Sequence, residues 1–279
     1  MEKIIFIVFL FSVSFVFSQT DEEESELDNI LDELFGIESF GVEAKKLSFL
    51  YATFSFSDKA YFAGRDFGVD QYGFTPSLSY MSSNNFFLSI GSAYYSKLDP
   101  QWDLISLSTG YSKFIGKKEK LSLTGVFSRS FFLSNTSDLN PNRLSTSISL
   151  TEKNLKIRVS GGYLFGGSST FYASADAAYR IKLIEDQKLT LDFRPGFNFL
   201  FSKQTISEEI SVSSFNSIVA ETDVFDLINT QFSFPFEADY GNWDFQFAYA
   251  INAPKAIGNE TDINQNGFFS FSIGYLIGF

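Results

Sequence analysis

The chain closes with Phe269-Ser-Phe-Ser-Ile-Gly-Tyr-Leu-Ile-Gly-Phe279, in which every odd position is apolar or aromatic. The even positions are small, apart from Leu276. An alternation with period two is typical of a β-strand that has one apolar face and one polar or neutral face. The stretch therefore predicts that the chain ends in a strand whose aromatic side chains all point to the same side.

The same alternation recurs along the sequence from Lys46 onward. Each alternating segment has about the ten residues that a tilted strand needs to cross the hydrocarbon layer of a membrane. The twelve segments lie at about 46–56, 72–81, 86–96, 103–115, 120–133, 143–151, 155–165, 169–184, 189–202, 229–240, 243–251 and 268–279. In the first of them the apolar parity changes between Tyr51 and Phe54, which predicts a bulge or a misplaced boundary there.

The connections between these segments alternate in length. The predicted short connections are Ser82–Asn85, Gly116–Glu119, Glu152–Asn154, Glu185–Lys188 and Gly241–Asn242. Most of the longer ones intervene, at 57–71, 97–102, 134–142, 203–228 and 252–267, and only Gly166–Ser168 breaks the rule. The 203–228 loop is too apolar for a free tail, so it is predicted to form a hairpin above the membrane or to fold inward.

This pattern, with a terminal aromatic residue at Phe279, resembles the Gram-negative outer-membrane β-barrel proteins, with a porin-like architecture. The resemblance spans residues 46–279 and matches no specific transporter family. It implies an all-β fold, a transmembrane antiparallel up-and-down barrel of about twelve strands with short periplasmic turns and longer outer loops. It also implies two partners, outer-membrane lipid and the outer-membrane assembly machinery during biogenesis.

Composition favours the same fold over a secreted β-sandwich, which also alternates. The chain has 36 phenylalanines and 13 tyrosines, yet its mean hydropathy is only +0.02. A barrel that is apolar outside and polar inside has this mixture. In a sandwich the same aromatic side chains would have to share one core, and they would overfill it.

The N-terminal residues predict export, and the resemblance implies that the exported chain is located in the cell outer membrane. Residues 1–18 combine Lys3, an apolar run and small residues before Gln19, as in a secretory signal peptide. The chain has no cysteine, so neither a lipid anchor nor a disulfide is expected. Residues 19–45 are predicted to be an acidic periplasmic leader, followed by the barrel at 46–279.

The leader is the most acidic part of the chain. Residues 21–33 hold eight acids and no base, out of a net charge of −12, and this acidity argues against a nucleic-acid partner. A short amphipathic helix is predicted from the helical spacing of Leu27, Ile30, Leu31, Leu34 and Phe35. Bases cluster in the predicted periplasmic turns and at the start of the barrel: Lys45, Lys46, Lys117, Lys118, Lys120, Lys153 and Lys188. Three interpretations stay open: a plug on this basic mouth, a site for a periplasmic partner, or a disordered acidic tail.

Charges on the predicted inner face are concentrated in strands seven to eleven, whereas the first six strands offer mainly Ser, Gly and Thr. The charged set is Lys156, Arg158, Asp176, Arg180, Lys182, Asp192, Arg194, Glu237, Asp239 and Asp244. These side chains are predicted either to brace the wall as ion pairs or to form a constriction that selects solutes. The five bases and five acids balance, so little ion preference is expected.

Other chemistry is mostly excluded. The chain has no histidine, which removes histidine-based triads and metal sites, and we expect neither an enzyme nor a cofactor. Asp262, Asn264 and Asn266 match the first half of a calcium loop, but Ile273 stands where the bidentate glutamate is needed. This makes a weak calcium candidate at most.

The sequence thus predicts a passive channel for small solutes. The alternative is a non-conducting outer-membrane scaffold or surface-binding protein that engages a partner through its outer loops or its acidic leader. Twelve strands give a bore between the packed eight-stranded barrels and the open porins, so strand number does not decide between them.

Overall fold

The computed structural model describes residues 48–66, 70–116, 120–133, 140–186, 188–213, 216–257, 260 and 263–278. All regular elements in these residues are β-strands, and none of them is a helix that could cross a membrane. The predicted signal peptide and the predicted leader helix, with Leu27, Ile30, Leu31, Leu34 and Phe35, lie outside the described residues.

Fourteen strands form one antiparallel sheet. They are β1 (Phe49–Ser57), β4 (Gly73–Met81), β5 (Phe86–Tyr95), β6 (Trp102–Ile115), β7 (Leu121–Phe132), β8 (Asn142–Glu152), β9 (Leu155–Phe165), β10 (Thr170–Tyr179), β11 (Ile181–Glu185), β12 (Leu189–Phe193), β13 (Gly196–Ser213), β14 (Asn216–Tyr240), β15 (Trp243–Pro254) and β16 (Asn266–Gly278). Two further strands, β2 (Tyr61–Phe62) and β3 (Arg65–Asp66), form a small hairpin in the first long loop.

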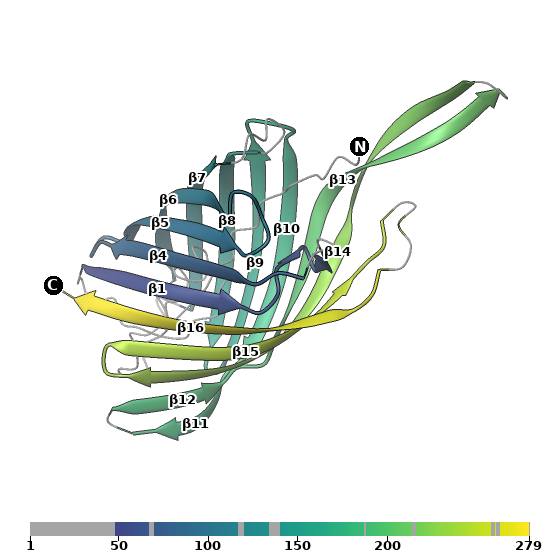
Figure 1. Cartoon of the computed structure of the whole chain (residues 1–279). Helices are drawn as coiled ribbons and strands as arrows, with labels where there is room; N and C mark the ends of the chain where they lie inside the picture. The colour runs from purple at the N-terminus through teal and green to yellow at the C-terminus, as the bar shows by residue number, and fades with distance from the viewer. Residues whose placement is uncertain are drawn as a thin grey trace.

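The sheet closes on itself into a barrel (Figure 1). Phe49 at the start of β1 pairs with Met81 of β4 on one side and with Gly278 of β16 on the other. β10 and β11 are separated only by Arg180, and β12 and β13 only by Arg194 and Pro195, so each pair makes one crossing. The prediction of a twelve-stranded closed antiparallel barrel is therefore confirmed.

The two ends of the barrel differ in their connections. β1 begins and β16 ends at the end that carries the short turns, among them Gly241–Asn242, where Gly241 has a φ of 61°. Outer-membrane barrels place short turns in the periplasm, and we call this the periplasmic end. The opposite, outer end carries the long connections.

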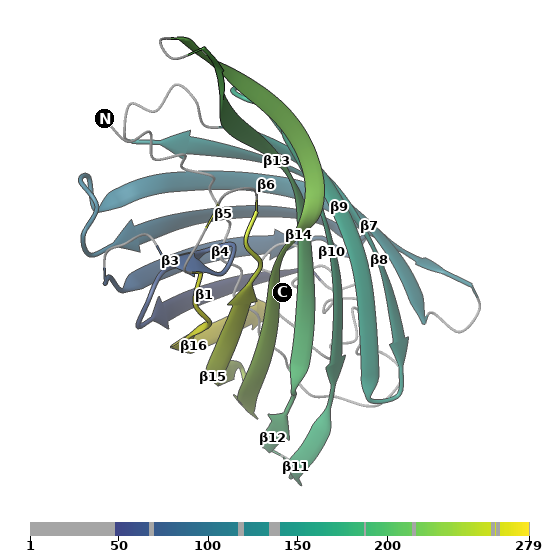
Figure 2. The same ribbon diagram turned by 90° about the vertical axis from the view of Figure 1, so that its right-hand side faces the viewer.

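The longest outer connection is a two-stranded ribbon. β13 and β14 stay paired from Lys203 and Phe225 up to Ser213 and Asn216, and they project beyond the barrel (Figures 1 and 2). The 203–228 segment is thus a hairpin above the membrane and does not fold inward. On it, a hydrogen bond from Lys203 holds the pKa of Asp223 below its ordinary value.

The two faces of the wall have opposite character. On β8, Leu144 and Ile148 point outward and are exposed, whereas Ser145 and Ser147 point inward and are buried. Many exposed large apolar side chains of the other strands share the outward face. This band is the surface that a lipid bilayer covers.

Hydroxyl groups line the inner face between β1 and β10 in cross-strand pairs. The paired oxygen atoms are 2.6–2.9 Å apart, so each pair satisfies one donor and one acceptor without a charge. The pairs are Thr53–Ser77, Ser79–Ser89, Ser108–Ser128, Ser112–Thr124 and Ser160–Ser174.

The bulge predicted in the first strand is wrong. β1 keeps an unbroken register with both β4 and β16, so Phe49 and Tyr51 lie on the inner face with Thr53. The parity rule failed because Tyr51 is inside for a polar reason: its hydroxyl donates a hydrogen bond to Asp244.

The outward face of β9 provides a test of membrane depth. Val159 lies near the middle of this strand and Leu155 at its periplasmic end, and both are exposed. We expect Val159→Arg to lower the free energy of unfolding by about 2–4 kcal/mol and Leu155→Arg by about 0–1 kcal/mol. Urea titration of the refolded protein in lipid vesicles measures both losses, and equal losses would contradict the assignment of this face to lipid.

Candidate functional site

The charged residues predicted for the lumen all occupy inward-facing positions. Lys156 and Arg158 lie on β9, Asp176 on β10, Lys182 on β11, Asp192 on β12, Glu237 and Asp239 on β14, and Asp244 on β15. Arg180 and Arg194 occupy the interruptions between strands. Lys182 is half-exposed at the periplasmic end, and most of the others are buried.

The two strand interruptions serve to place arginine side chains. Across them the backbone remains satisfied, because the amide of Tyr179 donates to Pro195 O at 3.0 Å and that of Arg180 to Asn154 O at 2.8 Å. The amide of Arg194 donates to Pro235 O at 3.0 Å. Below the break β12 pairs with β11 and above it β13 pairs with β10, so the wall stays continuous.

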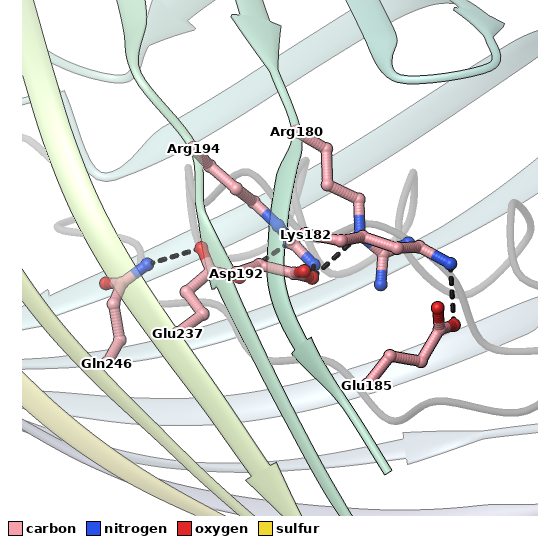
Figure 3. A network of polar contacts seen from close by, with 7 residues as sticks. All are labelled: Arg180, Lys182, Glu185, Asp192, Arg194, Glu237 and Gln246. Carbon is pink, nitrogen blue, oxygen red and sulfur yellow. Dashed lines mark hydrogen bonds and ion pairs between the residues drawn. The ribbon is translucent and has the colours of Figure 1, made fainter.

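The largest ion-pair network among the described residues contains Asp192 and Arg194 (Figure 3). Arg180 Nε donates to Asp192 Oδ2 at 2.7 Å, and Arg194 Nη2 reaches the same oxygen at 3.2 Å. Arg194 Nη1 lies 2.6 Å from Glu237 Oε2, and Gln246 Nε2 donates to Glu237 Oε1 at 3.0 Å. The network thereby connects four adjacent strands of the barrel wall, from the Arg180 interruption to β15. Arg194 lies in the middle of these strands and is 0% exposed.

Two further ion pairs flank this network. Arg158 and Asp176 face each other directly across β9 and β10 and are joined by two hydrogen bonds, from Nη2 and Nε. Lys182 Nζ lies 2.7 Å from Glu185 Oε1 at the periplasmic end, where both side chains contact solvent (Figure 3). The bidentate Arg158–Asp176 pair is the better constrained of the two.

Two participants were not expected from the sequence. Gln246 faces Glu237 in register on β15, and Tyr51 reaches Asp244 from β1, with Tyr51 Oη 3.1 Å from Asp244 Oδ2. For Gln246 the alternation itself was a signal, because it shares the inward parity of Asp244. For Tyr51 the pattern gave the opposite signal, since an aromatic residue was read as lipid-facing.

The calcium candidate receives no support from its described part. Asp262 lies outside the described residues, and Asn264 is exposed. The Asn266 side chain is already engaged in two hydrogen bonds. Its Nδ2 donates to Gly64 O at 2.6 Å, and its Oδ1 accepts from Asn252 Nδ2 at 2.9 Å. Among the described residues no group of three acidic, histidine or cysteine side chains is arranged to hold a metal ion.

The network predicts a large cost for removing its central arginine. Arg194→Met leaves Glu237 without its cation, and we expect a loss of about 3–5 kcal/mol in the free energy of unfolding. Arg129→Met, at an exposed position on β7, is the matched control and should cost no more than about 1 kcal/mol. In the double variant Arg194→Met/Glu237→Leu the two losses, measured by urea titration, should be clearly less than additive; strict additivity would show that the pair is not coupled.

Comparisons with known proteins give structural similarities only. No protein-family model and no curated protein matches the sequence. Among solved structures, the KdgM porin has 11% identity and a TM-score of 0.47 over 82% of this chain and 98% of its own. The NanC porin has 11% identity and a TM-score of 0.44 over 83% and 98%, and the COG4313 outer membrane channel from Pseudomonas putida F1 has 12% and 0.41 over 84% and 94%. The chain thus has a closed antiparallel β-barrel with an apolar outer band and a polar inner face, and these outer-membrane porins and channels are the solved structures that it is similar to.

Proposed function

We propose that the protein is a passive channel for small hydrophilic solutes. The observation that carries this proposal is a closed ring of twelve crossings whose inner face is mostly polar, with Phe49, Met81, Phe87 and Val126 as apolar exceptions. Such a wall offers hydrogen-bond partners to water and to solutes, while the apolar outer band faces lipid. A barrel that served only as a membrane anchor would not need a polar interior of this width.

The inner wall divides into two sectors with different roles. The sector from β1 through β8 presents mainly hydroxyl groups, which hydrogen bond to solutes without attracting or repelling charge. The sector from β9 to β15 presents the ion pairs, which stand in the periplasmic half of the barrel and hold its strands together. Solutes are therefore screened by size and charge near the periplasmic end.

No part of this proposal requires catalysis. The chain has neither histidine nor cysteine, and its inner carboxylates are engaged with arginine or stand on neighbouring strands of one wall. Passive diffusion down a gradient needs only a wall that replaces the hydration of the solute. We therefore assign the charged side chains to structure and selection.

One observation favours the alternative of an occupied lumen. Ser112, Thr124 and Ser128 on the inner face of β6 and β7 are at most 1% exposed. Large side chains share this inner face, among them Phe87 and Val126, which are 0% and 2% exposed. An interior filled by side chains favours a scaffold over an open pore.

The acidic leader is the segment that we propose for the plug. It precedes Ser48 in the sequence, and β1 begins at the periplasmic end, so the leader is joined to the barrel at that end. Lys120, Lys153 and Lys188 surround the same end. With eight acids in residues 21–33, the leader is complementary in charge to this rim.

Single-channel conductance in a planar bilayer tests the function directly. We expect stable conductance steps from the refolded mature protein, and larger steps after deletion of residues 20–36, because the plug is gone. A variant of full length, with Asp28, Asp32 and Glu33 changed to the corresponding amides, separates charge from length and should also conduct more.

The outcomes distinguish three interpretations: a plugged channel, a channel without a plug, and a non-conducting scaffold. A folded, heat-modifiable barrel that is silent in every form would overturn the channel and favour the scaffold. Conductance that does not change on deletion would retain the channel and reject the plug, leaving the leader as a tail or as a site for a periplasmic partner.

A further inference from the structure

The hairpin of the first outer connection is packed inside the ring of strands. It comprises residues 58–66, which we call the mouth hairpin, and joins β2 to β3 through a tight turn at Ala63 and Gly64. Ala60, Tyr61 and Ala63 are at most 7% exposed, although they belong to a connection at the outer end. In Figure 1 the mouth hairpin is the short dark blue segment beside β14.

Tyr61 attaches the mouth hairpin to the inner face of the last two strands. Its ring packs with Phe268 of β16, at 5.7 Å between the ring centroids, and with Ala250 of β15. Phe268 is buried, whereas Phe269, the next residue, is 48% exposed on the outward face. Because neighbouring residues of a strand point to opposite faces, the contact with Tyr61 is made inside the barrel.

Ala63 extends these contacts farther around the ring. It packs in a buried cluster with Leu200 of β13 and Ile228 of β14, and Tyr172 of β10 packs against this cluster. In the ring, β16, β15 and β14 separate β1 from β13 and β10. The mouth hairpin therefore follows the inner wall over nearly half of the ring.

Arg65 fixes the hairpin by three hydrogen bonds. Its Nη1 donates to Ile228 O at 3.3 Å, and its Nη2 donates to Lys255 O at 2.7 Å. The same Nη2 donates to Glu260 Oε2 at 3.0 Å, which adds an ion pair. Hydrogen bonds from a charged group are stronger than neutral ones, so Arg65 is the main polar anchor.

Gly64 allows the turn to lie against the wall. Its φ of 77° suits glycine, and a Cβ at this position would lie 2.3 Å from Asn229 Oδ1. Its carbonyl oxygen accepts a hydrogen bond from Asn266 Nδ2 at 2.6 Å, and Asn266 is itself held by Asn252. The wall thus provides a fitted seat for the turn.

A hairpin packed on the inner wall narrows the barrel at this end. With the usual strand spacing and tilt, a ring of twelve strands is about 24 Å wide between opposite backbones. A layer of strands packed face to face on such a wall takes up about 10 Å of that width. The mouth hairpin therefore removes a large part of the opening before any other side chain is counted.

We propose that the mouth hairpin is the constriction that sets the largest solute able to enter from the outer end. Its seat on the wall is independent of the proposed channel function, whereas its effect on transport rests on that function. It acts in addition to the ion-pair network, which lies in the periplasmic half of the barrel.

Polymer exclusion in a planar bilayer tests the constriction. Polyethylene glycols of graded size lower the conductance of the mature protein only if they enter its mouth. We expect Tyr61→Ala/Arg65→Met, which releases the hairpin, to shift the size limit to larger polymers when these are added at the outer end. Addition at the periplasmic end should give the limit of the parent.

Two further variants support this measurement. Gly64→Ala should shift the limit in the same direction, because the added Cβ displaces the turn from its seat. Tyr111→Ala/Arg129→Met removes the same two kinds of side chain from the exposed outward face of β6 and β7 and should keep the limit of the parent.

Cysteine labelling on intact cells measures the same opening without conduction. The chain has no cysteine, so Ser272→Cys introduces a single thiol on the inner face of β16, on the periplasmic side of Phe268. A bulky polyethylene glycol maleimide supplied outside the cells should label this thiol at least about ten times faster when Tyr61→Ala/Arg65→Met is also present. This is the factor expected from the loss of one charge-assisted hydrogen bond.

The two measurements separate this proposal from the channel function. If the protein is silent but labelling is faster in the released variant, the constriction stands and the channel function falls. If the protein conducts and neither the size limit nor the labelling changes, the constriction is overturned and the channel stands.

Discussion

The fold depends on the pairing of backbone amide and carbonyl groups in a medium that offers them no other partner. Lipid supplies no hydrogen bonds, so a sheet that crosses it must have no edge. The contact that removes the edge is the one between β1 and β16, which are joined over nine residue pairs from Phe49–Gly278 to Ser57–Ser270. The alternation of side chains, the polar lumen and the position of every charge follow from that closure.

Closure also explains how the charged wall is constructed. A residue placed on the inner face has neighbours on its own strand and on the strands beside it, so an arginine can serve more than one acid. Arg194 contacts Asp192, two residues before it, and Glu237 on the neighbouring β14. Its strand is interrupted at that point by Pro195, which cannot donate to the sheet, and Pro235 across the wall accepts the Arg194 amide instead. The break in the sheet and the centre of the network are thus the same feature.

The sequence was sufficient to predict the positions of the strands and most of their inward and outward faces. An alternation with period two is a local property, which can be recognised in each segment by itself. Asp192 was assigned to the inner face on this basis, and the structure agrees. What could not be predicted depends on register between strands. That Arg180 meets Asp192, that Gln246 meets Glu237, and that Asp239 meets Asp244 follow from the alignment of neighbouring strands. Tyr51 was misread because an aromatic ring with a hydroxyl suits either face. The extent of the β13–β14 ribbon was missed because a hairpin in water has no membrane boundary to limit it.

The pairing of the first strand with the last has a consequence for the order of assembly. Phe49 and Gly278 are at opposite ends of the barrel sequence, so their contact is the one of greatest separation along the chain, and such contacts form slowly. Until the final strand has been made and exported, β1 has an open side whose amides can pair with any extended segment nearby. The C-terminal strand therefore closes the barrel. A chain that lacked only this strand would expose two unpaired sheet edges, on β1 and β15, where the native protein has none.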